Sequence, residues 1–175
     1  LVATYSARRT EPGAAKQFTA SSGVFVSTNG GRSWLDRTAP AMQFYTKDLI
    51  VDPHDASQKT WYATVWNGWD NAESGGGLYR TTDRGVTWTR LFDDLRVSSA
   101  TINPSNPNEM YVTTEFNGLW ITHNLRDSLP TFTQDAAFPF RHPQRVVFNP
   151  YNSAEVWVTT FGSGANLKCR PGKRV

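Results

Sequence analysis

Two eight-residue stretches decide the fold of this chain: Ser27-Thr28-Asn29-Gly30-Gly31-Arg32-Ser33-Trp34 and Thr81-Thr82-Asp83-Arg84-Gly85-Val86-Thr87-Trp88. Each begins with a hydroxyl residue, has Asn or Asp two positions later and Gly four positions later, and ends in Trp. An Asn or Asp side chain bonds to nearby backbone amides, and Gly adopts a positive φ, so both stretches predict tight turns. The final Trp predicts an apolar anchor between neighbouring units. A degenerate third copy is Thr122-His123-Asn124-Leu125-Arg126-Asp127.

The segments around these turns also repeat. Strand-like segments that end in Asp-Pro or Asn-Pro occur at 49–53, 100–104 and 146–150, with the prolines 51 and 46 residues apart. A second strand-like segment follows each proline, a third follows a glycine, and a fourth begins at or near an aromatic residue. Four short strands per unit of roughly 45 to 50 residues, joined by Gly, Asn and Pro turns, are typical of β-propeller blades.

The repeat therefore predicts an all-β fold, a partial β-propeller of about three and a half four-stranded blades. A closed propeller has four or more blades, so we expect either a fragment of a longer propeller or one half of a homodimer that completes a ring. The propeller is expected at 1–164, with blade units at about 1–38, 39–91, 92–134 and 135–164, followed by a divergent basic C-terminal tail at 165–175.

The composition agrees with an all-β protein and excludes several classes of partner. Of 175 residues, 13% are aromatic and only 19% are charged, which favours strands and turns over helices. The net charge of +3 is small and gathers near the C-terminus, so we expect no nucleic-acid partner. No apolar run reaches the roughly 20 residues of a membrane helix, so we expect no membrane partner.

The sequence also gives no sign of a metal or a cofactor. A single cysteine, Cys169, excludes an internal disulfide framework. His54, His123 and His142 lie in different turns, and no spacing of His, Cys and Asp resembles a metal site. No phosphate-binding or dinucleotide-binding loop is present. No signal peptide opens the chain, and we expect a secreted or periplasmic protein in a mature or trimmed form.

The turn sequences resemble the Asp-box of bacterial neuraminidase (BNR) repeats, S/T-x-D-x-G-x-T/S-W. Asp-boxes occur in sialidases, xyloglucan-degrading glycoside hydrolases, sortilin receptors and photosystem II assembly factors. Together with the Asp/Asn-Pro and Tyr-x-x-Thr strands, the resemblance is closest to the xyloglucanase-like glycoside hydrolases and the sortilin-type propellers. It covers the chain to about Gly164 and implies a structural role for Asn29, Gly31, Trp34, Asp83, Gly85 and Trp88.

The alternation of strand direction predicts where a ligand would bind. Loops between the second and third strands, and segments between blades, share the face opposite the Asp-box turns, and propeller ligand sites use this face. Flat aromatic rings there can stack on sugars, and paired carboxylates can serve glycoside hydrolysis as acid and as base or nucleophile. An early insertion adds Arg8, Arg9 and Glu11 to this face. The candidate substrate-binding residues are Trp66, Trp69, Glu73, Phe116 and Arg141.

The resemblance also implies candidate catalytic residues. In the xyloglucanase-like enzymes a catalytic Asp follows a Tyr-x-x-Thr strand and precedes Gly, and Glu115 has that position between Tyr111 and Gly118. Glycoside hydrolysis uses two carboxyl groups, so Asp70 is the expected partner. The alternative for Trp66 and its neighbour Trp69 is that they close a gap between blades.

Two functions remain open at this point. The first is a carbohydrate-active propeller, glycoside hydrolase-like, that cleaves or holds xyloglucan, another β-glucan or a related polysaccharide or oligosaccharide, or a fragment of such an enzyme. The second is a non-catalytic protein-binding scaffold of the sortilin or assembly-factor type.

Overall fold

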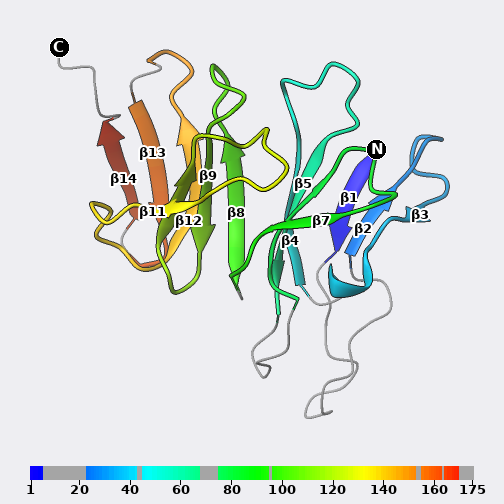
Figure 1. The fold of residues 1–175 in the computed structure, drawn as a ribbon, viewed down its shortest axis with the longest axis horizontal. Helices are drawn as coiled ribbons and strands as arrows, with labels where there is room; N and C mark the ends of the chain where they lie inside the picture. The colour runs from blue at the N-terminus through cyan, green and yellow to red at the C-terminus, as the bar shows by residue number, and fades with distance from the viewer. Residues whose placement is uncertain are drawn as a thin grey trace, which may run out of the picture. The chain divides into compact units, whose positions relative to one another are not determined.

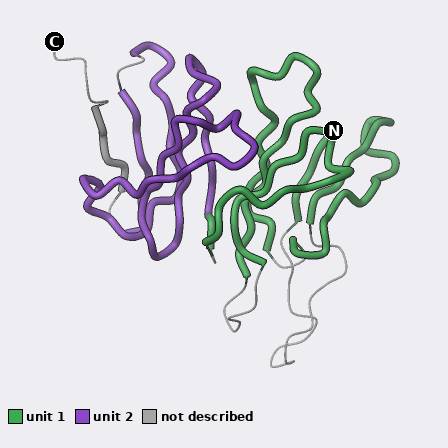
Figure 2. Tube along the Cα trace, in the orientation of Figure 1, with its two compact units in different colours: residues 1–97 green, residues 98–175 purple. Residues whose placement is uncertain are grey.

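The computed structural model describes residues 1–5, 23–42, 45–67, 75–94, 96–152, 155–162 and 164–169. In this part of the chain the protein is all-β: fourteen strands form four antiparallel sheets, and a short 3-10 helix, η1 (Pro40–Met42), connects the first two (Figure 1). The chain divides into two compact units, Leu1–Val97 and Ser98–Val175 (Figure 2). The predicted all-β fold is confirmed.

The first unit contains two sheets in which neighbouring strands follow chain order. They pack face to face around Val24 of the first sheet and Ala63, Val65 and Tyr79 of the second, with Met42 between them along the chain. The first sheet has β1 (Val2–Tyr5), β2 (Gly23–Val26) and β3 (Leu35–Asp36), and the second has β4 (Tyr45–Val51), β5 (Trp61–Trp66), β6 (Gly77–Thr81) and β7 (Thr89–Phe92).

The second unit contains the other two sheets, which have the same strand order. Its core joins Tyr111 and Leu119 of one sheet to Val146, Val156 and Val158 of the other. The strands are β8 (Val97–Ile102), which begins at the boundary, β9 (Met110–Thr114), β10 (Leu119–Thr122) and β11 (Thr133–Gln134), then β12 (Pro143–Phe148), β13 (Glu155–Thr160) and β14 (Gly164–Cys169).

Strand β14 covers residues 165–169 of the segment that was expected to form a divergent tail at 165–175. It pairs antiparallel with β13, from Thr160↔Gly164 to Glu155↔Cys169. Pairing of this kind satisfies the backbone donors and acceptors whatever the side chains are, which explains a strand that the polar sequence did not suggest. The described strands therefore number three, four, four and three per sheet.

The second strands of the sheets differ in how far they are buried. All residues of β5 and of β9 are buried, so both faces of these strands are covered. In β13 the pattern alternates instead: Val156 and Val158 are buried, whereas Trp157 is 39% exposed. Because successive strand residues point to opposite faces, β13 is covered on one face of its sheet only.

The Asp-box turns have nearly identical hydrogen bonds. Thr81 Oγ1 donates to Asp83 Oδ1 (2.7 Å) and accepts from Gly85 N (2.9 Å), and Asp83 accepts from the hydroxyl (2.6 Å) and the amide (2.9 Å) of Thr87. These bonds to Thr87, followed by that from Thr81, lower the pKa of Asp83 to about 2. The first turn repeats the pattern with Ser27, Asn29, Gly31 and Ser33, where Asn29 Nδ2 donates to Ser33 Oγ (2.8 Å).

The third copy of the box keeps two kinds of contact found in the other boxes, although its sequence is interrupted. Thr122 Oγ1 donates to Asn124 Oδ1 (2.9 Å), as in the other two turns. The residue that bonds back to Asn124 is Thr131, through its amide (2.9 Å) and its hydroxyl (3.2 Å). Thr131 comes seven residues after Asn124, whereas the corresponding separation is four in the other boxes, so the sequence pattern ends too early.

Candidate functional site

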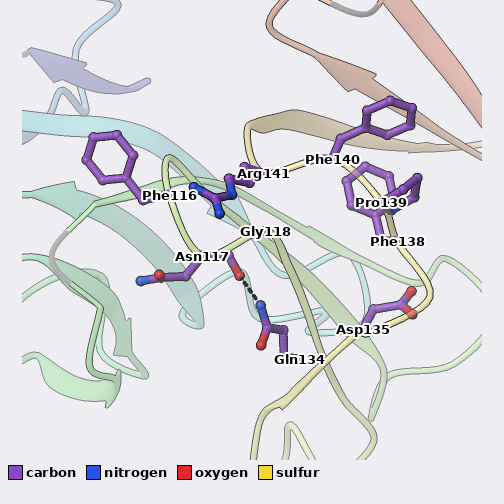
Figure 3. A pocket seen from close by; sticks show the side chains of 9 residues that line it. All are labelled: Phe116, Asn117, Gly118, Gln134, Asp135, Phe138, Pro139, Phe140 and Arg141. Atoms are coloured by element: carbon purple, nitrogen blue, oxygen red, sulfur yellow. Dashed lines mark hydrogen bonds between the residues drawn. The ribbon is translucent and has the colours of Figure 1, made fainter.

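A candidate site lies in the second unit, where two segments border a cavity of about 560 Å³. One segment connects β9 to β10, and the other connects β11 to β12, so both belong to the end of the sheets opposite the Asp-box turn. A volume of several hundred Å³ is typical of small-ligand sites. The cavity, shown in Figure 3, is lined by Phe116, Asn117, Gly118, Gln134, Asp135, Phe138, Pro139, Phe140 and Arg141.

Backbone bonds hold the β9–β10 turn in place. Thr114 donates to Gly118 O through its amide (3.1 Å) and its hydroxyl (2.9 Å), and Asn117 N donates to Thr114 Oγ1 (3.0 Å). Gly118 has a φ of +71°, a conformation that disfavours side chains. This turn is therefore rigidly set and presents Phe116 and Asn117, both exposed, toward solvent.

Two further bonds join this turn to the second segment. Gly118 N donates to Arg141 O (3.1 Å), and Gln134 Nε2 donates to Asn117 O (2.8 Å). The first brings the exposed Arg141 to the same cavity as Phe116, although 25 residues separate them in sequence. Two of the predicted substrate-binding residues are thus brought together.

Three aromatic side chains, those of Phe116, Phe138 and Phe140, are among the residues that line the cavity. Phe116 is 60% exposed. The rings of Phe138 and Phe140 meet edge to face with centroids 5.5 Å apart, and Phe138 packs against the core of the unit. In the view of Figure 3, Phe116 lies on one side of Arg141, and Phe138 and Phe140 lie on the other. Apolar rings around a guanidinium and two amides can stack on sugar rings and bond to their hydroxyls.

Glu115, the candidate catalytic acid, directly follows β9 and precedes the exposed Phe116. Its side chain is buried, with 4% exposure, and it is not among the residues that line the cavity. The carboxylate that does line the cavity is that of Asp135, whose Oδ1 accepts from Ala137 N (3.2 Å). Since a general acid must reach the glycosidic oxygen, Glu115 would have to become accessible before it could act.

The first unit contains the other described candidate, Trp66, at the end of β5. Trp66 is 7% exposed. Lys47 Nζ lies 4.3 Å and Arg96 Cζ 5.8 Å from the ring centroid, so cations cover its ring. This placement favours the alternative in which Trp66 fills a gap over stacking on sugar. Arg8, Arg9, Glu11, Trp69, Asp70 and Glu73 lie outside the described residues.

Polar groups at the start of β6 and the end of β7 pair with one another. Tyr79 donates its hydroxyl to Gly75 O (2.9 Å), and burial raises the pKa of this phenol. Arg90 bonds to Gly76 O and pairs with Asp93. These contacts tie the start of β6 to the end of β7 and indicate a structural role.

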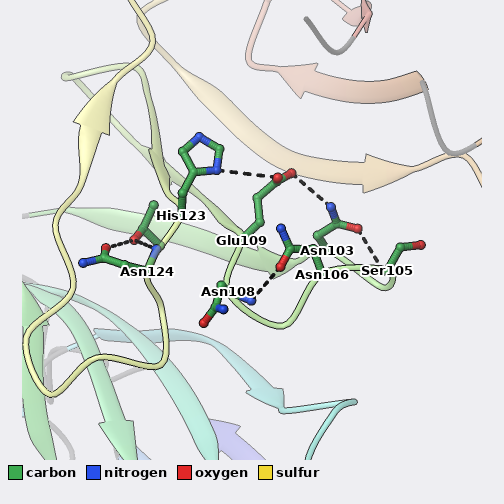
Figure 4. A network of polar contacts seen from close by, with 8 residues as sticks. Asn103, Ser105, Asn106, Asn108, Glu109, His123 and Asn124 are labelled. Carbon is green, nitrogen blue, oxygen red and sulfur yellow. Dashed lines mark hydrogen bonds and ion pairs between the residues drawn. The ribbon is translucent and has the colours of Figure 1, made fainter. Parts of the chain in front are cut away.

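A second polar cluster, at the Asp-box end of the second unit, also has a structural explanation (Figure 4). Glu109 is buried, accepts from Asn103 Nδ2 (3.1 Å), and lies 3.6 Å from His123 Nδ1. The next sheet has the same pair at the same spacing, since Asn149 Nδ2 donates to Glu155 Oε2 (2.8 Å). A pair that recurs in each Asn-Pro loop stabilises that loop.

The described residues contain no group of three or more His, Cys, Asp or Glu side chains that could hold a metal ion. Within the same residues, no helix has the length and hydropathy needed to cross a membrane.

Of the residues around the cavity, Gln134 and Asp135 were missed by the sequence-based candidates. They lie at the end of β11, a two-residue strand whose sequence gives only a weak strand pattern. The signal that could have found them is position, because they directly precede the segment that contains Arg141.

Comparison with known proteins relates the fold to one enzyme family. The chain is similar to the crystal structure of the Niastella koreensis GH74 enzyme, with a TM-score of 0.59 and 17% identity over 78% of this chain and 22% of that one. An ancestral GH74 enzyme gives a TM-score of 0.59 and 16% identity over 87% of this chain and 22% of its own. No protein-family model and no curated protein matches the sequence. The chain spans 22% of the length of these structures, and its fold matches part of a GH74 propeller.

Proposed function

We propose that the protein is a carbohydrate-active β-propeller, glycoside hydrolase-like, that holds a chain of xyloglucan or a related β-glucan in the cavity of the second unit. The observation that carries this proposal is the meeting of Phe116 and Arg141 at one cavity of about 560 Å³. The fold's match to part of a GH74 propeller supports the choice of substrate class.

The chemistry of the cavity suits a neutral sugar chain. The exposed ring of Phe116 offers an apolar face to the axial C–H groups of a pyranose. Arg141, Gln134 and Asn117 supply donors and acceptors for hydroxyl groups. The bonds from Gly118 N to Arg141 O and from Gln134 Nε2 to Asn117 O hold their two segments together. A long polysaccharide chain would also gain binding free energy from further contacts beyond the cavity.

Hydrolysis is a separate part of the proposal. It would need a carboxyl pair, with Glu115 and Asp70 in the two roles, and Glu115 is buried. Binding can therefore exist without turnover, and the two must be measured separately. Replacement of Glu115 with Gln should abolish hydrolysis of a β-glucan if Glu115 is the acid, and should leave binding intact.

Binding is tested by isothermal titration of the protein with xyloglucan oligosaccharides and with cello-oligosaccharides of equal backbone length. We expect Phe116→Ala and Arg141→Ala each to weaken binding roughly tenfold to a hundredfold, as for loss of an aromatic or Arg anchor. The matched control is Tyr151→Ala, which removes a ring that is 96% exposed and outside the cavity. Equal affinity of wild type and both cavity variants would refute the cavity as the site.

The alternative, a non-catalytic protein-binding scaffold of the sortilin or assembly-factor type, is favoured by the burial of Glu115. An exposed aromatic beside an arginine also suits a peptide with a carboxylate. No retention of any β-glucan and no turnover, with the cavity variants folded, would support this alternative.

A further inference from the structure

The segment between β11 and β12 is a loop whose two ends are fixed to neighbouring residues at the start of β10. Asp135 N donates to Leu119 O (2.8 Å), and Gly118 N donates to Arg141 O (3.1 Å). Because Gly118 and Leu119 adjoin in sequence, these two bonds close the base of the loop, which we call the cavity loop (135–141). The cavity loop therefore has an acid at one end of its backbone and a cation at the other.

The two charged residues at the ends of the cavity loop are also the two charged residues among the nine that line the cavity. Figure 3 shows Asp135 on the side of Phe138, apart from Arg141, which lies toward Phe116. A ligand in the cavity therefore meets the carboxylate and the guanidinium at different places.

The carboxylate and the guanidinium have opposite hydrogen-bonding abilities. A guanidinium only donates, so Arg141 can bond to any sugar oxygen, including ring and glycosidic oxygens, which only accept. An ionised carboxylate only accepts, so Asp135 can bond to a sugar only through a hydroxyl group that carries its hydrogen. Arg141 therefore cannot distinguish a free hydroxyl from an ether, whereas Asp135 can.

The turn that contains Asp135 is held by its own hydrogen bonds. Asp135 Oδ1 accepts from Ala137 N (3.2 Å), and Asp135 O accepts from Phe138 N (3.0 Å). A carboxylate has about four lone-pair sites, and the bond from Ala137 N uses one of them. If a sugar presents an ether to this carboxylate instead of a hydroxyl, the lone pairs of two oxygens face each other without a hydrogen between them.

We propose that Asp135 determines the specificity of the cavity, because it requires a free hydroxyl group on the sugar unit that it contacts. A unit that is methylated or carries a branch at that position is rejected, since its ether oxygen has no hydrogen to donate. This inference rests on the proposed binding of a β-glucan in the cavity. It adds the residue that decides where along a branched chain the cavity binds.

Isothermal titration of wild type and Asp135→Asn tests this proposal. The ligands are cello-oligosaccharides in which one hydroxyl of an internal unit, at O2, O3 or O6, is replaced by methoxy or by hydrogen. At one of these positions, both replacements should weaken binding to wild type roughly tenfold to a hundredfold, as for loss of a hydrogen bond to a charged group.

The variant should change the order of these two analogues. Asn keeps an Oδ1 that can accept from Ala137 N, and its amide can donate to a methoxy oxygen. At the sensitive position, Asp135→Asn should therefore bind the methoxy analogue within roughly threefold of the unmodified sugar, and more tightly than the analogue that carries hydrogen. A role of Asp135 in folding alone would not reverse this preference.

The matched control is Asp127→Asn, which removes the same charge from an exposed residue of the same unit outside the cavity. It should bind the whole series like wild type, and circular dichroism with thermal melting confirms that both variants are folded. If the unmodified sugar binds but each analogue loses the same factor in wild type and Asp135→Asn, the role of Asp135 is overturned and the sugar site stands. If the unmodified sugar does not bind wild type, the proposed function fails, and this inference fails with it.

Discussion

The two Asp-box turns of the first unit share one pattern of residue types and corresponding hydrogen bonds, but the surroundings of their tryptophans differ. Trp88 packs on the core between two sheets and donates to Arg37 O (2.7 Å), whereas Trp34 is 43% exposed. The turn is therefore formed by local chemistry alone. What the Trp contributes to stability depends on whether another sheet lies against it.

The largest effect is expected where this difference is greatest. Trp88→Ala should lower the free energy of unfolding by about 2 to 4 kcal/mol, because it removes a packed ring and its hydrogen bond. Trp34→Ala should change it by about 0.5 kcal/mol or less, as for an exposed side chain. Urea denaturation measures both changes in the free energy of unfolding. Equal losses in the two variants would contradict the comparison.

The glycines four positions after the hydroxyl residue provide a second comparison between the two Asp-box turns. Gly85 and Gly31 have φ angles of +82° and +89°, so Ala at either position is strained by about 1 kcal/mol. A Cβ on Gly85 would also lie 2.9 Å from Arg37 Cβ, whereas on Gly31 the nearest atom is Leu1 Cδ1 at 3.5 Å. Gly85→Ala should therefore cost about 2 to 3 kcal/mol in total.

The matched variant Gly31→Ala should cost only the backbone strain. Thermal unfolding of the two proteins side by side gives the difference directly. If Gly31→Ala proves as costly as Gly85→Ala, close packing by the neighbouring sheet is not the cause.

The central residues of the two boxes, Asn29 and Asp83, predict that the two turns differ in how their stability depends on pH. The folded pKa of Asp83, about 2, is below its ordinary value of 3.8, so its bonds to Thr87 stabilise the protein above pH 4. This contribution is lost as the pH falls from about 4 to 2, and after allowance for solvent screening it is about 1 kcal/mol. Asp83→Asn should therefore remove that part of the acid dependence.

Asn29 has the same place in the first box and does not titrate. Asn29→Asp should add a similar acid-dependent term, measured as the free energy of unfolding at several pH values. Asp55, whose pKa is lowered by bonds from Ser57 and Thr60, titrates in wild type and variants alike and cancels in the difference. A Asp83→Asn protein with the full acid dependence of wild type would contradict this role.

The smallest effect is expected in the third box. Thr131→Val removes the hydroxyl that donates to Asn124 Oδ1 (3.2 Å) but keeps the amide that donates at 2.9 Å. We expect a loss of about 0.5 kcal/mol, since the bond is long and exposed. Thr87→Val removes a shorter bond of 2.6 Å to a carboxylate and should cost more. A reversed order in chemical denaturation would show that the interrupted box is not equivalent.

Local chemistry explains how much of the fold could be predicted. The hydroxyl, acid, glycine and tryptophan of each box lie within eight residues, so the turn and its register can be inferred without knowledge of the rest. The hydrogen-bond partner of Asn124 could not be inferred from the sequence, because three extra residues displace Thr131 from the pattern. Strand β14 was missed since its pairing relies on backbone groups, and the exposure of Trp34 depends on a surface that its own sequence does not describe.

The candidate site was predictable in part. Phe116 and Arg141 could be assigned to one end of the sheets from strand direction, but their meeting depends on the bond from Gly118 N to Arg141 O. The burial of Glu115 depends on packing around the end of β9 and has no sequence signal. Asp70 lies outside the described residues, and its pairing with Glu115 stays a prediction.

All nine residues that line the cavity fall between Phe116 and Arg141, within 26 consecutive positions. A cavity whose lining is encoded by one short stretch of a gene can be duplicated, exchanged or lost as a single piece, while the strands around it continue to fold. Such a surface can change its ligand by recombination between repeats, without waiting for matched changes elsewhere. In a protein made of similar blades, new specificity can therefore be acquired by copying one loop pair from one blade into the next.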